Sequence, residues 1–492
     1  MDIKEEDKMA FNDLREFIER LEEEDELIRI KKLVDWDLEA GGIARRATEL
    51  KAPAPLFENI KDYPGYRLLS AQVGPSAKKD RYYCRMAMAM EMKPESGPEE
   101  IIEEYIKRKS NPIKPVLVSN GPCKENIFIE DNVDLERFPV PIIHEGDGGR
   151  YIGSWHAVAT KDLDTEWVNW GMYRLMLHDK ETMGSVIVPP QHIGRMFFQK
   201  YEPKNLPMEF AVIIGAEPIT PMIAGSPIPA GINEMDIIGA IRGKPLDVVK
   251  CETVDLVVPA TAEIIIEGEV LPNTRLDEGP FGEYVGYRAS KRSPKPVLKV
   301  KAITHRNNPI LTMCALGVPV DEGHLSIATI WAAEILETLR AQEMPVEMVF
   351  IPPEGVTHMI AISTKVPYPN FAKKVANAVW ASPAGIFSYY VVVVDDDIDV
   401  TNINEILWAL TTRCHPQRDI YIQPNSPTYP ILIPFLEPKD RLTGDNGASV
   451  LFDCTWPYHW NKDDIPIKAS FDVLWPKELQ KRIISNWKEY GF

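Results

Sequence analysis

Three separate segments of the sequence carry an amide, an imidazole and a carboxylate that could share one cation. Asn169 lies in the strand-like run VNWGMYR, His192 follows two prolines in VPPQHIGR, and Glu234 ends the stretch GSPIPAGINE. This mixed ligand set suits Mg²⁺ or Mn²⁺ better than a metal that prefers thiolates. A helix beginning at His192 would also point free backbone N–H groups at an anion such as phosphate. The alternative is structural: a strand-edge amide, a helix cap and a solvated carboxylate.

A second set consists of one arginine and two glutamates. Arg174 lies on an apolar strand-like run, and the segment LDEGPFGEYVGYR places Glu278 and Glu283 among glycines and a proline. A buried arginine needs carboxylate partners. One glutamate could pair with it while the other, in a drier place, acts as a general acid. A purely structural Arg–Glu bridge is the alternative.

Strict alternation along a strand would place Asn169 and Arg174 on opposite faces. Both can line one site only if the strand bends, and Gly171 is where we expect a bulge.

Other candidates are weaker. The run Asp395–Asp397 with Asp399 resembles a metal cluster, although acidic runs at strand ends are commonly solvated turns. Ser185 and Ser226 lack a Ser-His-Asp context, and His144 in PIIHEGDGG could be a loop histidine of either kind, functional or structural. Neither GxGxxG nor GxxxxGK[ST] occurs, which argues against the common phosphate-binding loops.

The composition excludes several classes of partner. The 492 residues include 55 Lys and Arg against 73 Asp and Glu, a net charge of −18, with no basic block that nucleic acid or an anionic membrane would need. A hydrophobic fraction of 45% is typical of a folded protein. Six scattered cysteines without CxxC argue against a disulfide framework. There is no secretory signal and no apolar run of about 18 residues, so we expect a cytoplasmic protein. Any anionic ligand needs local positive charge against this background.

The pattern of helices and strands that must position these residues predicts an α+β protein. Helical spacing predicts helices at 11–24, 98–109, 190–201, 325–339, 371–380, 403–410 and 477–490. Apolar or alternating runs predict strands at 27–30, 155–160, 167–177, 210–214, 262–269, 296–305, 347–351, 359–364 and 389–394. The strands dominate the middle of the chain, and helices alternate with strands after about residue 307. The last helix could cap its own domain or pack on a second subunit.

Six motifs together resemble the UbiD-type decarboxylases, which use prenylated FMN. They are NWGMYR (169–174), PPQHIG (189–194), PIPAGINE (227–234), DEGPFGEYVGYR (277–288), DDDIDV (395–400) and TTRCHP (411–416). The resemblance runs from about residue 12 to the end of the chain. It implies an N-terminal αβ domain (1–116), a central flavin-binding split barrel (117–306) and a C-terminal αβ dimerisation domain with a terminal helix (307–492). It also implies a homodimer or homohexamer.

The same resemblance implies how the cofactor is held. Asn169, His192 and Glu234 would bind a Mn²⁺ ion, or Mg²⁺, that clamps the cofactor phosphate. A K⁺ ion would use Glu234 with further residues: Ala224, Ser226, Arg413 and Asp453. The remaining cofactor contacts would be Gly171, Met172, Tyr173, Arg174 and Gln191. Relatives carry a lysine near the phosphate where this sequence has Pro383, and some have glycine where it has Asp395.

The implied reaction is the reversible, non-oxidative decarboxylation of an aromatic or α,β-unsaturated acid to release CO₂. Arg174 would hold the substrate carboxylate and orient Glu278, and Glu283 would donate the proton that replaces CO₂. Cleavage of the bond to CO₂ leaves an electron pair that only a cofactor can accept. A flavin prenyltransferase would supply that cofactor. Two alternatives are the catalytic subunit of a multi-subunit aryl carboxylase, running in the carboxylating direction, and a non-catalytic flavin-binding protein.

The substrate is less defined. Tyr284, Val188 and Gln191 neighbour the matched motifs and are expected to line its pocket. The C-terminal stretch DCTWPYHW favours a hydroxyaryl or simple aryl acid over a cinnamate.

Overall fold

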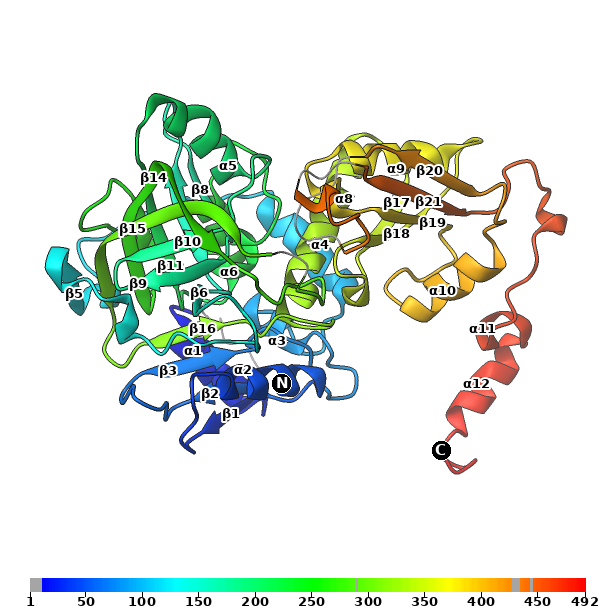
Figure 1. Ribbon diagram of the computed structural model, residues 1–492. Helices are drawn as coiled ribbons and strands as arrows, with labels where there is room; N and C mark the ends of the chain where they lie inside the picture. Colours follow the sequence, from blue (N-terminus) through cyan, green and yellow to red (C-terminus); the bar gives the residue numbers. More distant parts are fainter. Residues whose placement is uncertain (1–10, 289–290, 427–433, 443–445) are drawn as a thin grey trace.

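The computed structural model describes residues 11–288, 291–426, 434–442 and 446–492, and it confirms the predicted α+β class. The described residues form sheets of four, nine and five strands and a small three-stranded sheet, with helices packed between them (Figure 1). The division of the chain at residues 116 and 306 stays a prediction. Residues 310–313 share a sheet with residues 67–70, so strands from both sides of the predicted boundaries pair with each other.

The N-terminal sheet combines segments from distant parts of the chain. Its order is β1 (Leu27–Ile30), β2 (Ala54–Phe57), β3 (Arg67–Ser70) and β16 (Ile310–Met313). The accompanying helices are α1 (Leu14–Glu23), α2 (Glu39–Glu49), α3 (Cys84–Ala89) and α4 (Pro98–Lys109). Helix α1 begins after Asp13, whose carboxylate accepts a hydrogen bond from the Glu16 N–H at 2.9 Å and caps the helix. Helix α4 starts with Pro98, whose missing N–H costs nothing in the first turn.

The central sheet carries the predicted strand-rich region. Its order is β6 (Tyr151–Gly153), β9 (Leu175–Asp179), β10 (Thr182–Ser185), β15 (Ser293–His305), β14 (Ile264–Glu278), β11 (Met208–Ile214), β7 (Ala157–Lys161) and β8 (Val168–Gly171), with β5 (Asn126–Ile129) paired to β15. Strands β9 and β8 are therefore six positions apart in the sheet, which is about 29 Å at ~4.8 Å per spacing. Yet only residues 172–174 join them, a link that reaches about 13 Å. The sheet must therefore curl until the end of β8 lies close to the start of β9, as a half-barrel (Figure 1).

We call residues 172–174 the seam, and here two predictions were wrong. The sequence predicts one strand over 167–177, whereas the chain leaves β8 at Gly171 and enters β9 at Leu175. The expected bulge at Gly171 is absent, since the β7–β8 ladder runs in regular register from Val168 to Gly171. Gly171 matters for another reason: a Cβ there would lie 2.2 Å from the hydroxyl of Tyr173.

Shorter elements surround the half-barrel. The predicted helix at 190–201 is α5 (His192–Met196), which continues as a wider π-helical turn, Phe197–Tyr201. Helices α6 (Ile219–Ala224) and α7 (Glu234–Arg242) follow β11. A small sheet joins β13 (Val257–Pro259), β12 (Asp247–Lys250) and β4 (Val116–Leu117).

The C-terminal sheet is partly parallel and buried on its middle strand. Its order is β17 (Val346–Phe350), β18 (Met359–Thr364), β19 (Tyr390–Asp395), β21 (Ala448–Cys454) and β20 (Ile420–Pro424), with helices α8 (Ala328–Ala341), α9 (Phe371–Ala381) and α10 (Ile403–Thr412). Residues 391–394 of β19 are four buried valines, typical of a strand covered on both faces.

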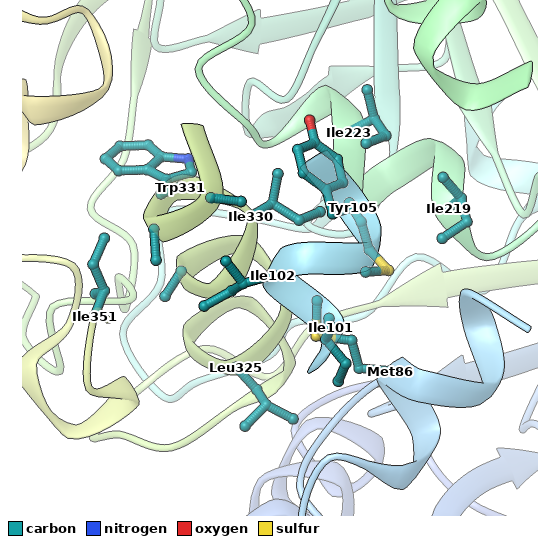
Figure 2. Close-up of a cluster of buried hydrophobic side chains, with 14 of the residues drawn as sticks. Met86, Ile101, Ile102, Tyr105, Ile219, Ile223, Leu325, Ile330, Trp331 and Ile351 are labelled. Carbon is teal, nitrogen blue, oxygen red and sulfur yellow. The ribbon is translucent and has the colours of Figure 1, made fainter. Parts of the chain in front are cut away.

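Helices α4, α6 and α8 join the three parts through one apolar cluster (Figure 2). Polar contacts fix their register. The Tyr105 hydroxyl donates to Glu334 Oε1 at 2.7 Å, and Lys109 Nζ lies 2.7 Å from Glu334 Oε2. The Trp331 indole N–H donates to the Gly225 carbonyl at 3.1 Å. Apolar burial therefore holds the central half-barrel against the C-terminal sheet.

The C-terminal segment, which we call the arm, extends away from the rest of the protein (Figure 1). It carries α11 (Phe471–Leu474) and α12 (Lys477–Ser485). The helix predicted at 477–490 is thus confirmed up to Ser485. Within the described ranges, no helix combines the length and the apolar character that crossing a membrane requires.

Glu322 ties the N-terminal sheet to the segment that precedes α8. Its Oε1 accepts the Ala71 N–H at 3.0 Å, and the side chain is buried. Burial raises the pKa of Glu322 from 4.5 to about 8. Between these values the folded protein keeps a proton that the unfolded chain releases, so stability falls as the pH rises through this window.

We expect Glu322→Gln to remove this pH dependence, because glutamine stays neutral. From pH 5 to 9 the wild type should lose on the order of a few kcal/mol relative to the variant. Thermal unfolding midpoints measured across this range give the comparison, with Glu19→Gln on the exposed face of α1 as the control. Parallel curves for wild type and Glu322→Gln would contradict the assignment.

Candidate functional site

The seam places both predicted sets of residues at one point of the half-barrel. Asn169 lies on β8, just before the seam. Arg174 is the last residue of the seam, and β9 begins after it. Because the chain changes strands here, the two side chains are freed from the alternation of a single strand.

The amide, the imidazole and the carboxylate come together on the β8 side. His192 Nδ1 lies 2.9 Å from Asn169 Oδ1, and the Asn169 amide donates to the Tyr173 hydroxyl at 3.2 Å. Glu234, the first residue of α7, accepts the backbone N–H of Trp170 at 2.9 Å. Asn169 and Glu234 are both buried.

The electrostatics of this cluster suit a divalent cation. Burial raises the pKa of Glu234 to about 8, and its hydrogen bonds within the described chain come only from backbone N–H groups. Burial, followed by the charge of Arg195, lowers the pKa of His192 to about 4 and keeps its imidazole neutral, as a metal ligand must be. No three His, Cys, Asp or Glu side chains converge as a metal site in the described part of the chain. A cation here would therefore rely on the Asn169 amide and on ligands from outside the protein.

The residues expected around K⁺ are not all in contact with one another in the described part of the chain. Ala224 ends α6, and the Ser226 hydroxyl donates to the Met222 carbonyl at 2.7 Å. Asp453, on β21, accepts from the Thr455 hydroxyl at 2.6 Å. Among the described contacts, none joins Arg413 or Asp453 to Ala224, Ser226 or Glu234.

The acidic run after β19 forms an ion pair. Arg413 donates to both carboxylate oxygens of Asp397, at 2.8 and 2.6 Å, and its Nη1 lies 3.7 Å from Asp395 Oδ2. Pro383 is exposed and directly precedes the 3₁₀ turn Ala384–Phe387.

On the other side of the seam, Arg174 lies between the two glutamates. Its Nε and Nη2 donate to Oε1 and Oε2 of Glu278 at 2.9 and 2.7 Å, a bidentate pair, and its Nη1 donates to Glu283 Oε1. Burial alone would lower the pKa of Arg174, but the charges of Glu283 and Glu278 outweigh it and raise the pKa.

The two carboxylates differ in their surroundings. Glu278, the last residue of β14, has a fully buried side chain, whereas the Glu283 side chain is 9% exposed and lies on the loop that follows. Both glutamates therefore pair with Arg174, and Glu283 is the less deeply buried of the two.

Tyr151 is a member of the site that the sequence did not indicate. Its buried hydroxyl donates to Glu278 Oε1 at 2.9 Å, and its ring lies 4.1 Å from that of Phe281. The glycine-rich run HEGDGGRYIG, which contains Tyr151, is the sequence signal that could have indicated it.

The expected pocket residues face the C-terminal part of the chain. The Tyr284 ring lies 6.4 Å from that of His358, and Val188 packs against Phe387. Gln191 Oε1 accepts the Val188 N–H at 3.0 Å and so turns back on its own loop. These contacts place Tyr284 and Val188 where the half-barrel meets the C-terminal part of the chain.

Known proteins are similar to this chain over almost its whole length. Models of the 3-octaprenyl-4-hydroxybenzoate carboxy-lyase (UbiD) N-terminal, Rift-related and C-terminal domains match residues 18–105, 114–319 and 324–454. The chain is 36% identical over 490 residues to a pyrrole-2-carboxylic acid decarboxylase of Pseudomonas aeruginosa, covering 98% of both.

Solved structures are similar as well. The chain matches vanillic acid decarboxylase of Sedimentibacter hydroxybenzoicus in its closed form with a TM-score of 0.84 and 31% identity, covering 98% of this chain and 99% of that one. It also matches an evolved dimeric form of the UbiD-class enzyme HmfF from Pelotomaculum thermopropionicum in complex with prFMN, with a TM-score of 0.78, 30% identity and coverage of 93% and 97%.

We expect Arg174→Met to destabilise the protein strongly, because it leaves two buried carboxylates without a cation. The loss should be about 3–5 kcal/mol, measured by urea denaturation. The matched control is Arg340→Met, which breaks an exposed bidentate pair with Glu103 and should cost about 1 kcal/mol or less. Equal losses in the two variants would contradict the buried pairing.

Proposed function

This chain belongs to the UbiD family of carboxy-lyases, and we propose that it decarboxylates an aromatic or α,β-unsaturated carboxylic acid, reversibly, with prenylated FMN. The observation that carries the proposal is the buried Arg174, which pairs with the fully buried Glu278 and also with Glu283, whose side chain is 9% exposed. Relatives that act on pyrrole-2-carboxylic and vanillic acids support this reaction class.

The cofactor proposal rests on the Asn169–His192–Glu234 cluster and on the relative that holds prFMN. These three residues would hold Mn²⁺ or Mg²⁺ against the cofactor phosphate, and the seam with Gln191 would hold the rest of the phosphate. When bound, the flavin supplies the electron sink that amino-acid side chains lack. We also propose that Ala224, Ser226 and Glu234 hold K⁺; Arg413 at the end of α10 pairs with Asp397, and Asp453 on β21 binds Thr455.

Each residue of the Arg–Glu set then has a distinct task. Arg174 binds the substrate carboxylate, and the bidentate pair with Glu278 fixes the plane of its guanidinium. Tyr151 fixes Glu278 in turn. When the bond to CO₂ breaks, Glu283 delivers its proton to the carbon that CO₂ leaves, and in the reverse direction it takes that proton back. A protein that merely binds flavin has no need of Glu283 in this place.

The substrate we propose is a small hydroxyaryl or simple aryl acid. Tyr284 and Val188 would offer it apolar and aromatic side chains, and they lie against His358 and Phe387 respectively. A flavin prenyltransferase would supply the cofactor.

We also propose that the chain assembles with copies of itself, as a homodimer or homohexamer. The arm presents large apolar side chains to solvent, with Ile467 73% and Trp487 50% exposed. Such a surface is typical of an interface. The dimeric HmfF form offers a precedent in a relative.

We expect Glu283→Gln to abolish turnover and to leave the bound cofactor unchanged, because glutamine keeps the shape but has no transferable proton. Turnover of a panel of aryl acids and the flavin absorbance of the purified protein measure the two effects. Full activity in this variant would end the proton-donor assignment.

We expect His192→Ala and Glu234→Gln to lose the cofactor, since each removes one ligand of the proposed cation. Both variants should purify with little flavin absorbance from cells that also produce a flavin prenyltransferase, and Mn²⁺ should no longer raise the thermal midpoint of the apoprotein. His305→Ala, a buried histidine stacked on Phe128, is the control. Full flavin content in the His192 and Glu234 variants would count against the clamp.

A further inference from the structure

Glu283 lies at the start of a tight turn in the loop that follows β14. The Gly286 N–H donates to the Glu283 carbonyl at 2.9 Å, and the Glu283 N–H donates to the Tyr287 carbonyl at 3.2 Å. Gly286 has φ +80°, a conformation that favours glycine. These bonds shape the turn, but they do not fix where it sits in the protein.

A first His–Asp pair holds the residue before Glu283. Asp147 Oδ1 accepts the Gly282 N–H at 3.0 Å, and its Oδ2 lies 3.0 Å from His144 Nδ1. His144 Nε2 in turn donates to the Leu316 carbonyl at 2.8 Å. A Cβ on Gly282 would lie 2.6 Å from His144 Nδ1, so the two loops touch without room for a side chain.

A second His–Asp pair holds the residue after Glu283. His324 Nε2 donates to the Tyr284 carbonyl, and its Nδ1 lies 3.0 Å from Asp321 Oδ1. Both side chains are almost completely buried. Burial alone would lower the pKa of His324, but the charge of Asp321 outweighs it and raises the pKa.

The two pairs come from different parts of the fold. His144 and Asp147 belong to the loop before β6, whereas Asp321 and His324 lead into α8 and the C-terminal sheet. Each pair forms a hydrogen bond with the backbone next to Glu283. Asp147 accepts the Gly282 N–H, and His324 donates to the Tyr284 carbonyl. Neither pair touches Glu283 itself within the described contacts.

We propose that His144–Asp147 and Asp321–His324 are positioning pairs that set the Glu283 carboxyl group against Arg174 and the reacting carbon. The inference rests on the proposed role of Glu283 as proton donor. Because proton transfer needs a donor within hydrogen-bond distance of its target, a small shift of this loop slows the reaction without removing any reacting group.

The test compares two variants at each histidine. Glutamine can place its amide N–H near the position of Nε2 and keep the bond to the carbonyl, whereas leucine cannot. We expect His324→Leu to lower kcat by about tenfold to a hundredfold while KM and flavin content change little. The solvent deuterium isotope effect on kcat should rise, because proton delivery becomes slower. His324→Gln should stay within about threefold of wild type.

A second readout needs no cofactor. Amide hydrogen exchange of the apoprotein over residues 279–288 should accelerate in His324→Leu and stay close to wild type in His324→Gln. His144→Leu and His144→Gln repeat the comparison at the other pair and serve if His324→Leu does not fold. His305→Leu controls for the loss of a buried imidazole and should move only the thermal midpoint.

Equal kcat in the leucine and glutamine variants at both histidines, or losses that only follow the thermal midpoint as in His305→Leu, would overturn the inference. Its failure is distinct from failure of the proposed function. If Glu283→Gln is inactive while both leucine variants retain full kcat, only the positioning role is wrong. If Glu283→Gln is fully active, the proton-donor role itself is wrong.

Discussion

The buried guanidinium of Arg174, shared between two carboxylates, is the interaction on which the site depends. A charge removed from water needs partners in a fixed geometry, and here the partners arrive from a strand end and a loop more than a hundred residues away. The curl of the central sheet brings β8 and β9 together, the end of β14 supplies Glu278, and the loop after it supplies Glu283. The fold is thus arranged so that one cation meets two acids at the seam.

The local chemistry was readable from the sequence, and the long-range geometry was not. Asn169, His192 and Glu234 could be singled out because their types suit a cation, and the structure brings the first two into contact. The bulge at Gly171 was a wrong prediction because alternation assumes one continuous strand, whereas the chain crosses between the two ends of a curled sheet. The short π-helical continuation of α5 likewise depends on packing that periodicity does not record.

Contacts between segments that lie far apart in the sequence were what the sequence-based predictions missed most. Tyr151 reaches Glu278 across 127 positions, and Gly282 reaches Asp147 across 135. The pairing of β16 with β3 joins the two sides of a predicted domain boundary. Motif reading could name His144 as a loop histidine, but only the packing of loop on loop shows what it holds.

The chain is acidic overall, and the proposed site would offset that charge locally. An excess of 18 acidic residues would repel a carboxylate or a phosphate at long range. In the function we propose, Arg174 would meet the substrate carboxylate at short range, and the buried Glu234 with neutral His192 would hold a divalent cation. Net charge therefore says little about which ligands this protein accepts. The most direct test is a crystal structure of Glu283→Gln loaded with prenylated FMN and an aryl acid such as vanillic acid. Our account predicts the ligand carboxylate within hydrogen-bond distance of the Arg174 guanidinium, with its ring between the seam and Tyr284. A carboxylate bound elsewhere, with Arg174 held only by its two glutamates, would contradict it.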